Sequence, residues 1–177
     1  MRGEPFRVEP MDLPLRKQAE LVMIHVPGGA SERLGIFRVW GDGKIEPLSS
    51  GGEGLSAKTW LLGTFAVIED LSPPRVTRMS PRNGATITST RPRLTAYVSE
   101  EGKGINDEAT RFTLDGKRLI PEYDPEAALI KATPKVPLAR GTHVFEATIR
   151  DKAGHETTSS SQFTVGAATR RGAKGRR

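Results

Sequence analysis

The chain has 177 residues, of which 36% are hydrophobic and 27% are charged, and its formal net charge at pH 7 is +6. It contains no cysteine, which excludes a disulfide framework, a thiolate metal site and a cysteine nucleophile. Five of its basic residues stand in the last eight positions, so the charge belongs mainly to a C-terminal tail and not to the folded body.

Apolar runs in the chain are short. The longest strings, such as Leu21–Ile24 and Phe65–Ile68, have the length of a strand, whereas a helix that spans a bilayer needs about 20 apolar residues. Residues 1–20 contain no apolar segment typical of a signal peptide. We therefore expect no membrane span. If the protein is exported, Met1 is expected to be an artificial start, a fragment boundary or a wrongly assigned start codon.

The first half of the chain predicts short strands separated by turns rich in glycine. Pro27–Gly29 is a turn cluster, Gly41–Gly43 is typical of a hairpin turn, and Ser49–Gly54 is typical of a loop. No amphipathic helix of useful length is expected, because Pro10–Glu20 is the only candidate and Pro14 interrupts it. The expected strands cover residues 21–26, 34–40, 44–48, 55–60 and 63–69.

A domain boundary is predicted at Asp70–Pro74. The pair Pro73-Pro74 removes two backbone donors and favours extended geometry, so neither sheet can continue through it. Such a linker is short and rather stiff.

The second half alternates apolar and polar residues, as strands of a sandwich do. Asp115-Gly116 predicts a tight turn between two of them. The expected strands cover residues 75–79, 86–88, 92–99, 109–114, 117–120, 127–133, 142–150 and 161–165. Two of them alternate most clearly, with core-facing residues Leu94, Ala96 and Val98 in the first and His143, Phe145, Ala147 and Ile149 in the second.

These elements predict an all-β protein of two consecutive antiparallel β-sandwiches followed by a disordered basic C-terminal tail. About seven short strands within roughly 90 residues fit an immunoglobulin-type sandwich for the second. The expected domains are an N-terminal β-sandwich at 1–72, an immunoglobulin-like sandwich at 73–166 and the tail at 167–177.

The turn motifs of the second half resemble those of bacterial immunoglobulin-like domains, which are fibronectin III-like modules of envelope and secreted proteins. The resemblance covers residues 73–165. It departs at His155, where the family usually has asparagine, and at Glu100-Glu101, where aspartate is common. The motifs that carry it are Ser80–Gly84, Gly102–Asn106, Leu114–Gly116, Leu138–His143 and Asp151–His155. The resemblance implies a location outside the cytoplasm, either extracellular or in the periplasm or envelope.

Residues 5–72 are similar to the β-sandwich that precedes such a domain in the C-terminal accessory region of exported lysostaphin-type zinc endopeptidases. The cues are short, among them the segment Leu62–Asp70 running into Pro73-Pro74. The catalytic motifs of those enzymes are absent from this sequence.

The histidines His25, His143 and His155 lack the spacing of a metal site, and we expect them to have structural roles. Serines are frequent, as in Ser49-Ser50 and Ser159–Ser161, but none stands in a nucleophile elbow. The sequence therefore predicts no enzyme activity, no catalytic residue, no cofactor-binding residue and no metal ligand.

One alternative to that prediction stays open in the acidic loop Glu100–Glu108. Together with Asp151 it could supply oxygen ligands for calcium, although Lys103 in its middle opposes this and solvated acidic loops are commoner. The four large aromatic residues leave a second alternative. We expect each tryptophan to fill a core; otherwise they could form a platform for a sugar ring. These residues are Trp40, Trp60, Tyr97 and Tyr123.

The sequence thus favours a structural spacer or adhesion-type module of an envelope-associated or secreted bacterial protein. One alternative is an accessory module that positions a cell-wall endopeptidase on its polymer. Another is weak binding of polyanions through the tail, whose five charges would make such binding sensitive to salt. The partners considered are cell-wall polymer, other envelope proteins and polyanions.

Overall fold

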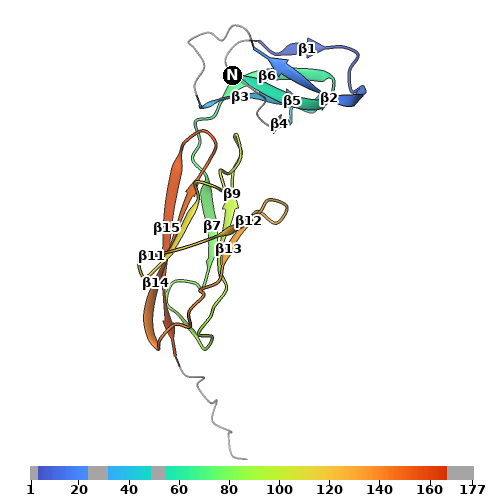
Figure 1. Cartoon of the computed structure of the whole chain (residues 1–177). Helices are drawn as coiled ribbons and strands as arrows, with labels where there is room; N and C mark the ends of the chain where they lie inside the picture. Colours follow the sequence, from blue (N-terminus) through green and yellow to red (C-terminus); the bar gives the residue numbers. More distant parts are fainter. Residues whose placement is uncertain (1–3, 24–31, 49–54, 167–177) are drawn as a thin grey trace, which may run out of the picture. The chain divides into compact units, whose positions relative to one another are not determined.

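The computed structural model describes residues 4–23, 32–48 and 55–166 (Figure 1). All the regular secondary structure in these residues consists of β-strands, which confirms the all-β prediction. Within them no helix is long and apolar enough to cross a membrane. The predictions for His25, for the turn and loop at 27–29 and 49–54, and for the tail at 167–177 fall outside the described residues.

The chain divides into two compact units. The first unit comprises Met1–Pro73 together with two loop segments, Glu100–Asn106 and Arg150–His155. The second unit comprises Pro74–Ser99, Asp107–Ile149 and Glu156–Arg177. The assignment of two loop segments to the first unit was not anticipated, and the domain limits 1–72, 73–166 and 167–177 stay a prediction.

The first unit contains a four-stranded sheet in the order β1-β6-β3-β4 and a separate pair, β2-β5. The pairings within both are antiparallel. The strands are β1 (Phe6–Val8), β2 (Pro14–Val22), β3 (Leu34–Val39), β4 (Ile45–Pro47), β5 (Ser56–Leu61) and β6 (Gly63–Glu69).

The core of the first unit joins this sheet to the pair. Alternate residues of β3 and β6 point to one side of the sheet, where they contact residues of the pair, as in a small sandwich. The buried members of the cluster are Leu34, Ile36, Leu55, Ala57, Phe65 and Val67, with Phe6, Val8, Leu21, Met23 and Leu48 packed around them.

Two local predictions in this unit can be compared with the structure. The hairpin at Gly41–Gly43 is confirmed, because Gly43 takes a left-handed φ of 83° and its N–H donates to the carbonyl of Trp40 at 2.9 Å. No helix of useful length was expected, and the interrupted candidate Pro10–Glu20 forms none, since most of it belongs to strand β2. The register of β2 shifts between Pro14 and Ala19, and this irregularity hides the alternation that marks a strand.

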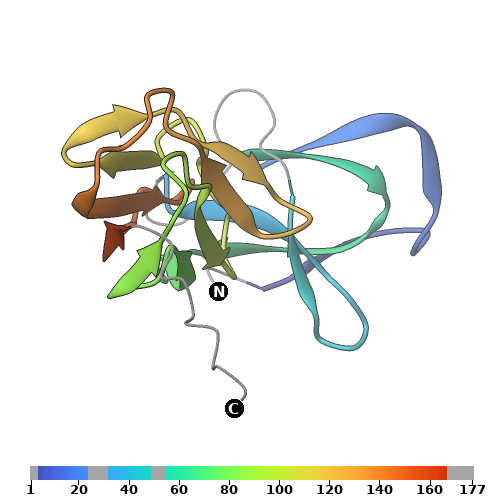
Figure 2. The same ribbon diagram turned by 90° about the horizontal axis from the view of Figure 1, so that it is seen from below.

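The second unit consists of two packed sheets, seen from two directions in Figures 1 and 2. One sheet has the order β11-β10-β14-β15-β8 and the other β12-β13-β9-β7. The strands are β7 (Arg75–Ser80), β8 (Ala85–Ile87), β9 (Leu94–Ser99), β10 (Arg111–Leu114), β11 (Lys117–Leu119), β12 (Glu122–Asp124), β13 (Leu129–Ala132), β14 (Gly141–Arg150) and β15 (Glu156–Val165).

This strand order is that of an immunoglobulin-like sandwich. In the immunoglobulin fold, one sheet contains the first, second, fifth and fourth strands, and these places are taken by β7, β9, β13 and β12. The facing sheet contains the third, sixth and seventh strands, and these places are taken by β10, β14 and β15. The chain crosses from one sheet to the other between β7 and β8, and β8 then pairs in parallel with the last strand, β15. The structure thus confirms an immunoglobulin-like fold for this unit.

The core of the second unit follows the predicted alternation. Leu94 and Ala96 of β9 are fully buried and Val98 is nearly so, as are all four predicted residues of β14. Thr95 differs, because its alternation with Leu94 and Ala96 predicts a position on the outer face, whereas the structure buries it. The turn at Asp115-Gly116 is confirmed, since both residues have a positive φ, as a two-residue hairpin loop requires. Strand β12 was not anticipated.

Candidate functional site

Asp70 is a buried carboxylate that directly follows strand β6. Its backbone N–H donates to the carbonyl of Arg33 at 2.8 Å. Its two carboxylate oxygens accept backbone N–H groups, Oδ1 from Ser72 at 3.1 Å and Oδ2 from Lys103 at 2.8 Å. Gly102 approaches so closely that a Cβ at this position would collide with the carboxylate. The geometry therefore requires glycine at 102.

Asp151 is a second carboxylate, with no exposed surface. Its Oδ1 accepts the backbone N–H groups of Ala153 at 2.9 Å and of His155 at 2.8 Å, and Gly154 takes a left-handed φ of 91° between them. Its Oδ2 lies 2.9 Å from Nδ1 of His155. The turn motif recognised in the sequence is thus held together by the aspartate that begins it.

The loop 100–106 pairs with this turn. Ile105 forms an isolated antiparallel bridge with Asp151, and the N–H of Lys152 donates to the carbonyl of Gly104 at 2.9 Å. At the start of the loop, Oε1 of Glu100 accepts the N–H of Gly102. The carboxylate of Glu100 interacts electrostatically with those of Asp70 and Asp151.

We call Asp70, Glu100, Asp151 and His155 the carboxylate cluster. Ligand atoms of Asp70, Asp151 and His155 lie within 4.8 Å of one another. Oε2 of Glu100 is buried and has no hydrogen-bond partner. All four residues belong to the first unit. Carboxylate oxygens and an imidazole are groups that can hold a metal ion.

The surroundings of the cluster shift the pKa of two neighbours. Burial raises the pKa of Glu100, hydrogen bonds from the backbone oppose the rise, and the negative charges of Asp70 and Asp151 add to it. Burial lowers the pKa of Lys103 against the opposing attraction of Asp70 and Glu32. The ammonium group of Lys103 donates to the backbone carbonyl of Glu32 at 2.6 Å. Negative charge is therefore concentrated where water has little access.

The sequence identified part of this cluster. It pointed to the loop Glu100–Glu108 with Asp151, and the structure does bring Glu100 to Asp151, whereas Asp107 and Glu108 are exposed. It missed Asp70, which stands far away in the chain beside the two prolines. His155 was judged only by its spacing from the other histidines. Its position four residues after Asp151 was the signal that could have linked it to this carboxylate.

His143 has the structural contacts expected of it. It is buried on the core side of β14, its Nδ1 lies 2.7 Å from Oδ2 of Asp115, and its Nε2 lies 3.0 Å from the carbonyl oxygen of Ala139. Its ring also packs against Phe163. The hydrogen bond to Asp115 is the main reason that the pKa of His143 is raised, and the carbonyl of Ala139 adds to the effect.

Asp115 has a pKa shifted in the opposite direction. Burial alone would raise it, but hydrogen bonds from His143 and from the backbone N–H of Val144 outweigh burial and lower the pKa. Oδ1 accepts the N–H of Val144 at 2.9 Å. The pair thus fixes the tight turn to strand β14.

The four large aromatic residues are divided between the two units. Trp40 and Trp60 belong to the first unit, and Tyr97 and Tyr123 to the second. Trp60 is 57% exposed on β5, so the expectation that it fills a core is wrong. Successive strand residues face opposite sides, and Thr59, the residue before Trp60, takes the buried side.

Trp40 is half-buried through polar contacts that the sequence did not indicate. The guanidinium of Arg38 lies 4.4 Å from the centre of its ring, and its Nε1–H donates to Glu46 at 3.1 Å. Arg38 is itself buried and donates to the carbonyls of Leu61 and Leu62. Its guanidinium also pairs with Asp12 at 3.0 Å. Arg38 therefore takes part in the structure of the first unit.

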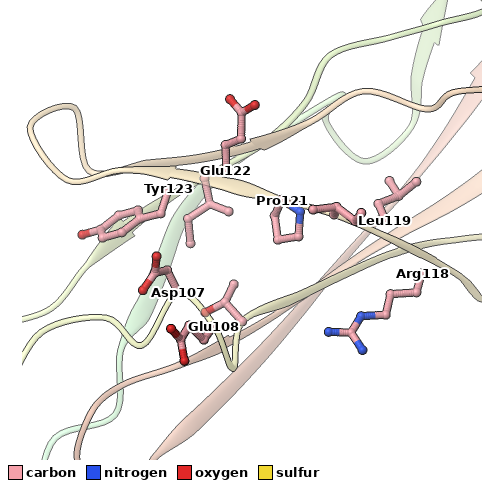
Figure 3. Close-up of a pocket in the computed structure, with 10 residues that line it drawn as sticks. Asp107, Glu108, Arg118, Leu119, Pro121, Glu122 and Tyr123 are labelled. Carbon is pink, nitrogen blue, oxygen red and sulfur yellow. The ribbon is translucent and has the colours of Figure 1, made fainter.

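A hollow of about 500 Å³ lies in the second unit between the start of β10 and strands β11 and β12. Figure 3 shows the carboxylates of Asp107 and Glu108 on one side of it, with Arg118 apart from them and the carboxylate of Glu122 pointing away. These three acidic residues are exposed, so water solvates them and their presence assigns no chemistry to the hollow.

No protein-family model matches the chain, and no curated protein sequence matches it. Solved structures do resemble it at low sequence identity. CopC from Methylosinus trichosporium OB3b is 15% identical, with a TM-score of 0.45 over 54% of this chain and 95% of CopC. Dimeric latent PorU from Porphyromonas gingivalis is 13% identical, with a TM-score of 0.44 over 76% of this chain and 20% of PorU.

The fibronectin(III)-like modules of Clostridium thermocellum CbhA are 14% identical, with a TM-score of 0.41 over 98% of this chain and all of that chain. Likenesses of this degree carry no functional argument. The class of the protein rests on its own strand order, which is that of an all-β chain with an immunoglobulin-like sandwich in its second unit.

Proposed function

We propose that the chain is a non-catalytic module that serves as a spacer or adhesion-type unit of an exported or envelope-associated protein. The location belongs to the same proposal and is supported by the resemblance of its turn motifs to those of bacterial immunoglobulin-like domains. We also propose that residues 5–72 are similar to the accessory region of lysostaphin-type endopeptidases.

The observation that carries the proposal is how the histidine–aspartate pairs are used. Asp115 and Asp151 both accept backbone N–H groups and hold turns. A catalytic histidine needs one ring nitrogen free to face a nucleophile or substrate, with the other held by the carboxylate. Nε2 of His143 instead faces the carbonyl of Ala139. Both ring nitrogens of this residue therefore serve the fold.

A binding experiment tests this proposal. The full chain is sedimented with purified cell-wall sacculi at low and high salt, beside a full-length variant in which the five basic residues of the last eight are changed to glutamine. A spacer leaves the pellet free of protein once the tail is neutralised or salt is high. Salt-resistant sedimentation of the neutralised variant contradicts a passive spacer and favours the targeting function.

A second function, positioning a larger enzyme on a wall polymer, is favoured by the exposure of Trp60. An exposed tryptophan offers a flat apolar face to a sugar ring. Trp60→Ala abolishes sacculus binding if this face is the contact. Val22→Ala is the matched control, because Val22 is equally exposed on β2, the strand paired with β5. Equal binding by the two variants removes the support for this function.

A further inference from the structure

We propose that a groove beside strand β11 of the second unit, which we call the β11 groove, binds an extended segment of a partner protein in which apolar and acidic residues alternate. The segment pairs with the free edge of β11. This inference rests on the adhesion-type part of the proposed function and gives it a partner of stated chemistry.

The β11 groove has a volume of about 560 Å³. One wall runs from the end of β10 through β11 to Ile120, and the other consists of residues 133–139, which connect β13 to β14. All of these residues belong to the second unit. A cleft of this size with a mainly apolar lining is typical of a binding site. The apolar lining consists of Leu114, Leu119, Ile120, Pro134, Val136, Pro137, Leu138 and Ala139.

The groove contains the two most exposed large apolar side chains of the described residues. Ile120 is 80% exposed on one wall and Val136 is 73% exposed on the other. Single exposed apolar residues are common on protein surfaces, whereas apolar residues gathered in one groove mark an interaction site. Covering both side chains removes apolar surface from water, which favours association.

Strand β11 has unpaired backbone groups next to the groove, because it is the outermost strand of its sheet (Figure 1). Leu114 and Lys117 close the two-residue turn as a hydrogen-bonded pair, so the next pair, Thr113 with Arg118, is not hydrogen-bonded. The N–H and C=O of Arg118 therefore point away from β10, and no backbone hydrogen bond within the described residues reaches them. An extended peptide that lies along β11 can pair with these groups, as in β-augmentation.

The charge of the groove selects an acidic partner. Its cationic residues, Lys117, Arg118 and Lys135, are all exposed. None of the three forms an ion pair in the part of the chain that the structure describes. The one carboxylate among the lining residues, Asp115, is already paired with His143. Acidic side chains of a partner therefore find free cations here, and basic ones are repelled.

The register of β11 explains why the partner residues alternate. Leu119 lies opposite the buried Phe112, so its side chain is on the inner side of the sheet, and Arg118 is on the outer side. An added strand thus places apolar residues on the side of Leu119 and acidic residues on the side of Arg118. The hollow that holds Asp107 and Glu108 borders the same strand, but these carboxylates are exposed and salt screens their repulsion.

The test uses the full-length variant with the neutralised tail, because the basic tail would itself attract an acidic peptide. The probe is a fluorescent hexapeptide of alternating valine and glutamate, and the control probe has lysine in place of glutamate. Fluorescence anisotropy measures the affinity. Hydrogen exchange followed by NMR measures protection of the Arg118 N–H, and the N–H of Lys117, which is bonded to β10, is the internal control. Since no wall polymer is present, failure here is distinguishable from failure of the sacculus experiment.

We expect the glutamate peptide to bind and to slow exchange of the Arg118 N–H, and the lysine peptide not to bind. Lys135→Glu weakens binding on the order of ten-fold or more. Its matched control, Arg82→Glu, changes the net charge equally at an exposed residue outside the groove and leaves binding unchanged. Val136→Glu abolishes binding, whereas Val144→Glu, at an exposed valine outside the groove, does not.

Pos135 and 136 are tested separately, so either variant keeps the test decisive if the other does not fold. Absent binding of the glutamate peptide overturns the proposal, as do equal losses in Lys135→Glu and Arg82→Glu. Binding without protection of the Arg118 N–H overturns the pairing with β11. Tighter binding of sodium decanoate than of the peptide overturns the choice of a peptide. Dimerisation in sedimentation velocity that Val136→Glu removes would assign the groove to a second copy of the chain instead.

Discussion

The two units are stabilised in different ways. The second unit buries large apolar residues from regularly alternating strands. They include Phe112 and Phe145, whose ring centres lie 4.9 Å apart in an edge-to-face arrangement. The first unit has a smaller apolar cluster and adds a buried guanidinium, Arg38, that holds two backbone carbonyls. The comparison teaches that the second unit is stabilised mainly by apolar burial along alternating strands, whereas the first adds a buried guanidinium that joins residues distant in the chain.

The largest effect that sharpens this contrast is expected from Phe145→Ala. Removing a fully buried ring costs about 3–5 kcal/mol of the free energy of unfolding. Urea denaturation followed by far-UV circular dichroism measures the loss. Val144→Ala, at a 44% exposed position on the same strand, changes the free energy by less than about 0.5 kcal/mol. Similar losses in both variants would contradict the assigned register of β14.

Arg38→Met tests the polar contacts of the first unit. The change removes the guanidinium donor from the carbonyls of Leu61 and Leu62, which keep only the hydrogen bonds from the Thr59 hydroxyl and the Asp12 N–H, and we expect this to cost about 1–3 kcal/mol. Tryptophan emission during urea denaturation is the measurement. The control is Asp12→Asn, because Asp12 is largely exposed and its ion pair contributes about 1 kcal/mol or less. A larger loss from the control would place the importance on the ion pair instead of the carbonyls.

Gly102→Ala tests how closely the loop 100–106 approaches Asp70. A Cβ at 102 collides with the carboxylate, so the loop must shift at a cost of about 1–3 kcal/mol. Gly41→Ala is the matched control, since Gly41 has no atom within 4 Å of the added Cβ and, like Gly102, no positive φ. Thermal unfolding followed by tryptophan emission compares the two variants. An unchanged unfolding temperature in Gly102→Ala would contradict the close contact between Asp70 and the loop.

The smallest expected effect is the pH dependence of the pair His143–Asp115 in the second unit. Because the folded state raises the pKa of His143, its stabilisation is complete below the unfolded value of 6.5 and is lost as pH rises through the folded pKa. Because the folded state lowers the pKa of Asp115, its stabilisation is present above the unfolded value of 3.8 and is lost as pH falls through the folded pKa.

Stability is thus expected to be greatest between these two unfolded values, with a loss of about 1 kcal/mol or less above neutral pH. Urea midpoints measured at pH 5.5 and 8.5 by circular dichroism give the difference. His143→Gln keeps a hydrogen-bonding side chain but cannot titrate, so its difference is smaller. An unchanged pH profile in this variant would show that His143 is not the titrating group.

The sequence predicted the second unit better than the first for a physical reason. Strands β9 and β14 lie between neighbours, so one face is buried along their whole length and alternation is visible. Strand β2 was missed because its outward residues are polar and its register shifts. Strand β12 was missed because it has three residues at a sheet edge.

The carboxylate cluster was predictable only in part. Asp151 stands in a turn motif and Glu100 in an acidic loop, and both can be recognised locally. Asp70 joins them through a hydrogen bond to Lys103, 33 residues later in the chain. Contacts across such separations leave no periodic pattern in a single sequence.

The parallel pairing of β8 and β15 has a mechanical consequence. In the second unit the chain enters at Pro74, passes through β7 to β8 and leaves after β15, and the three residue pairs between β8 and β15 run from Phe163–Ala85 to Val165–Ile87. Tension applied through the two ends of this unit draws the strands past each other along their axes. The bonds at both ends of the pairing, from Gly84 to Gln162 and from Gly166 to Ile87, then bear the load together instead of opening one after another.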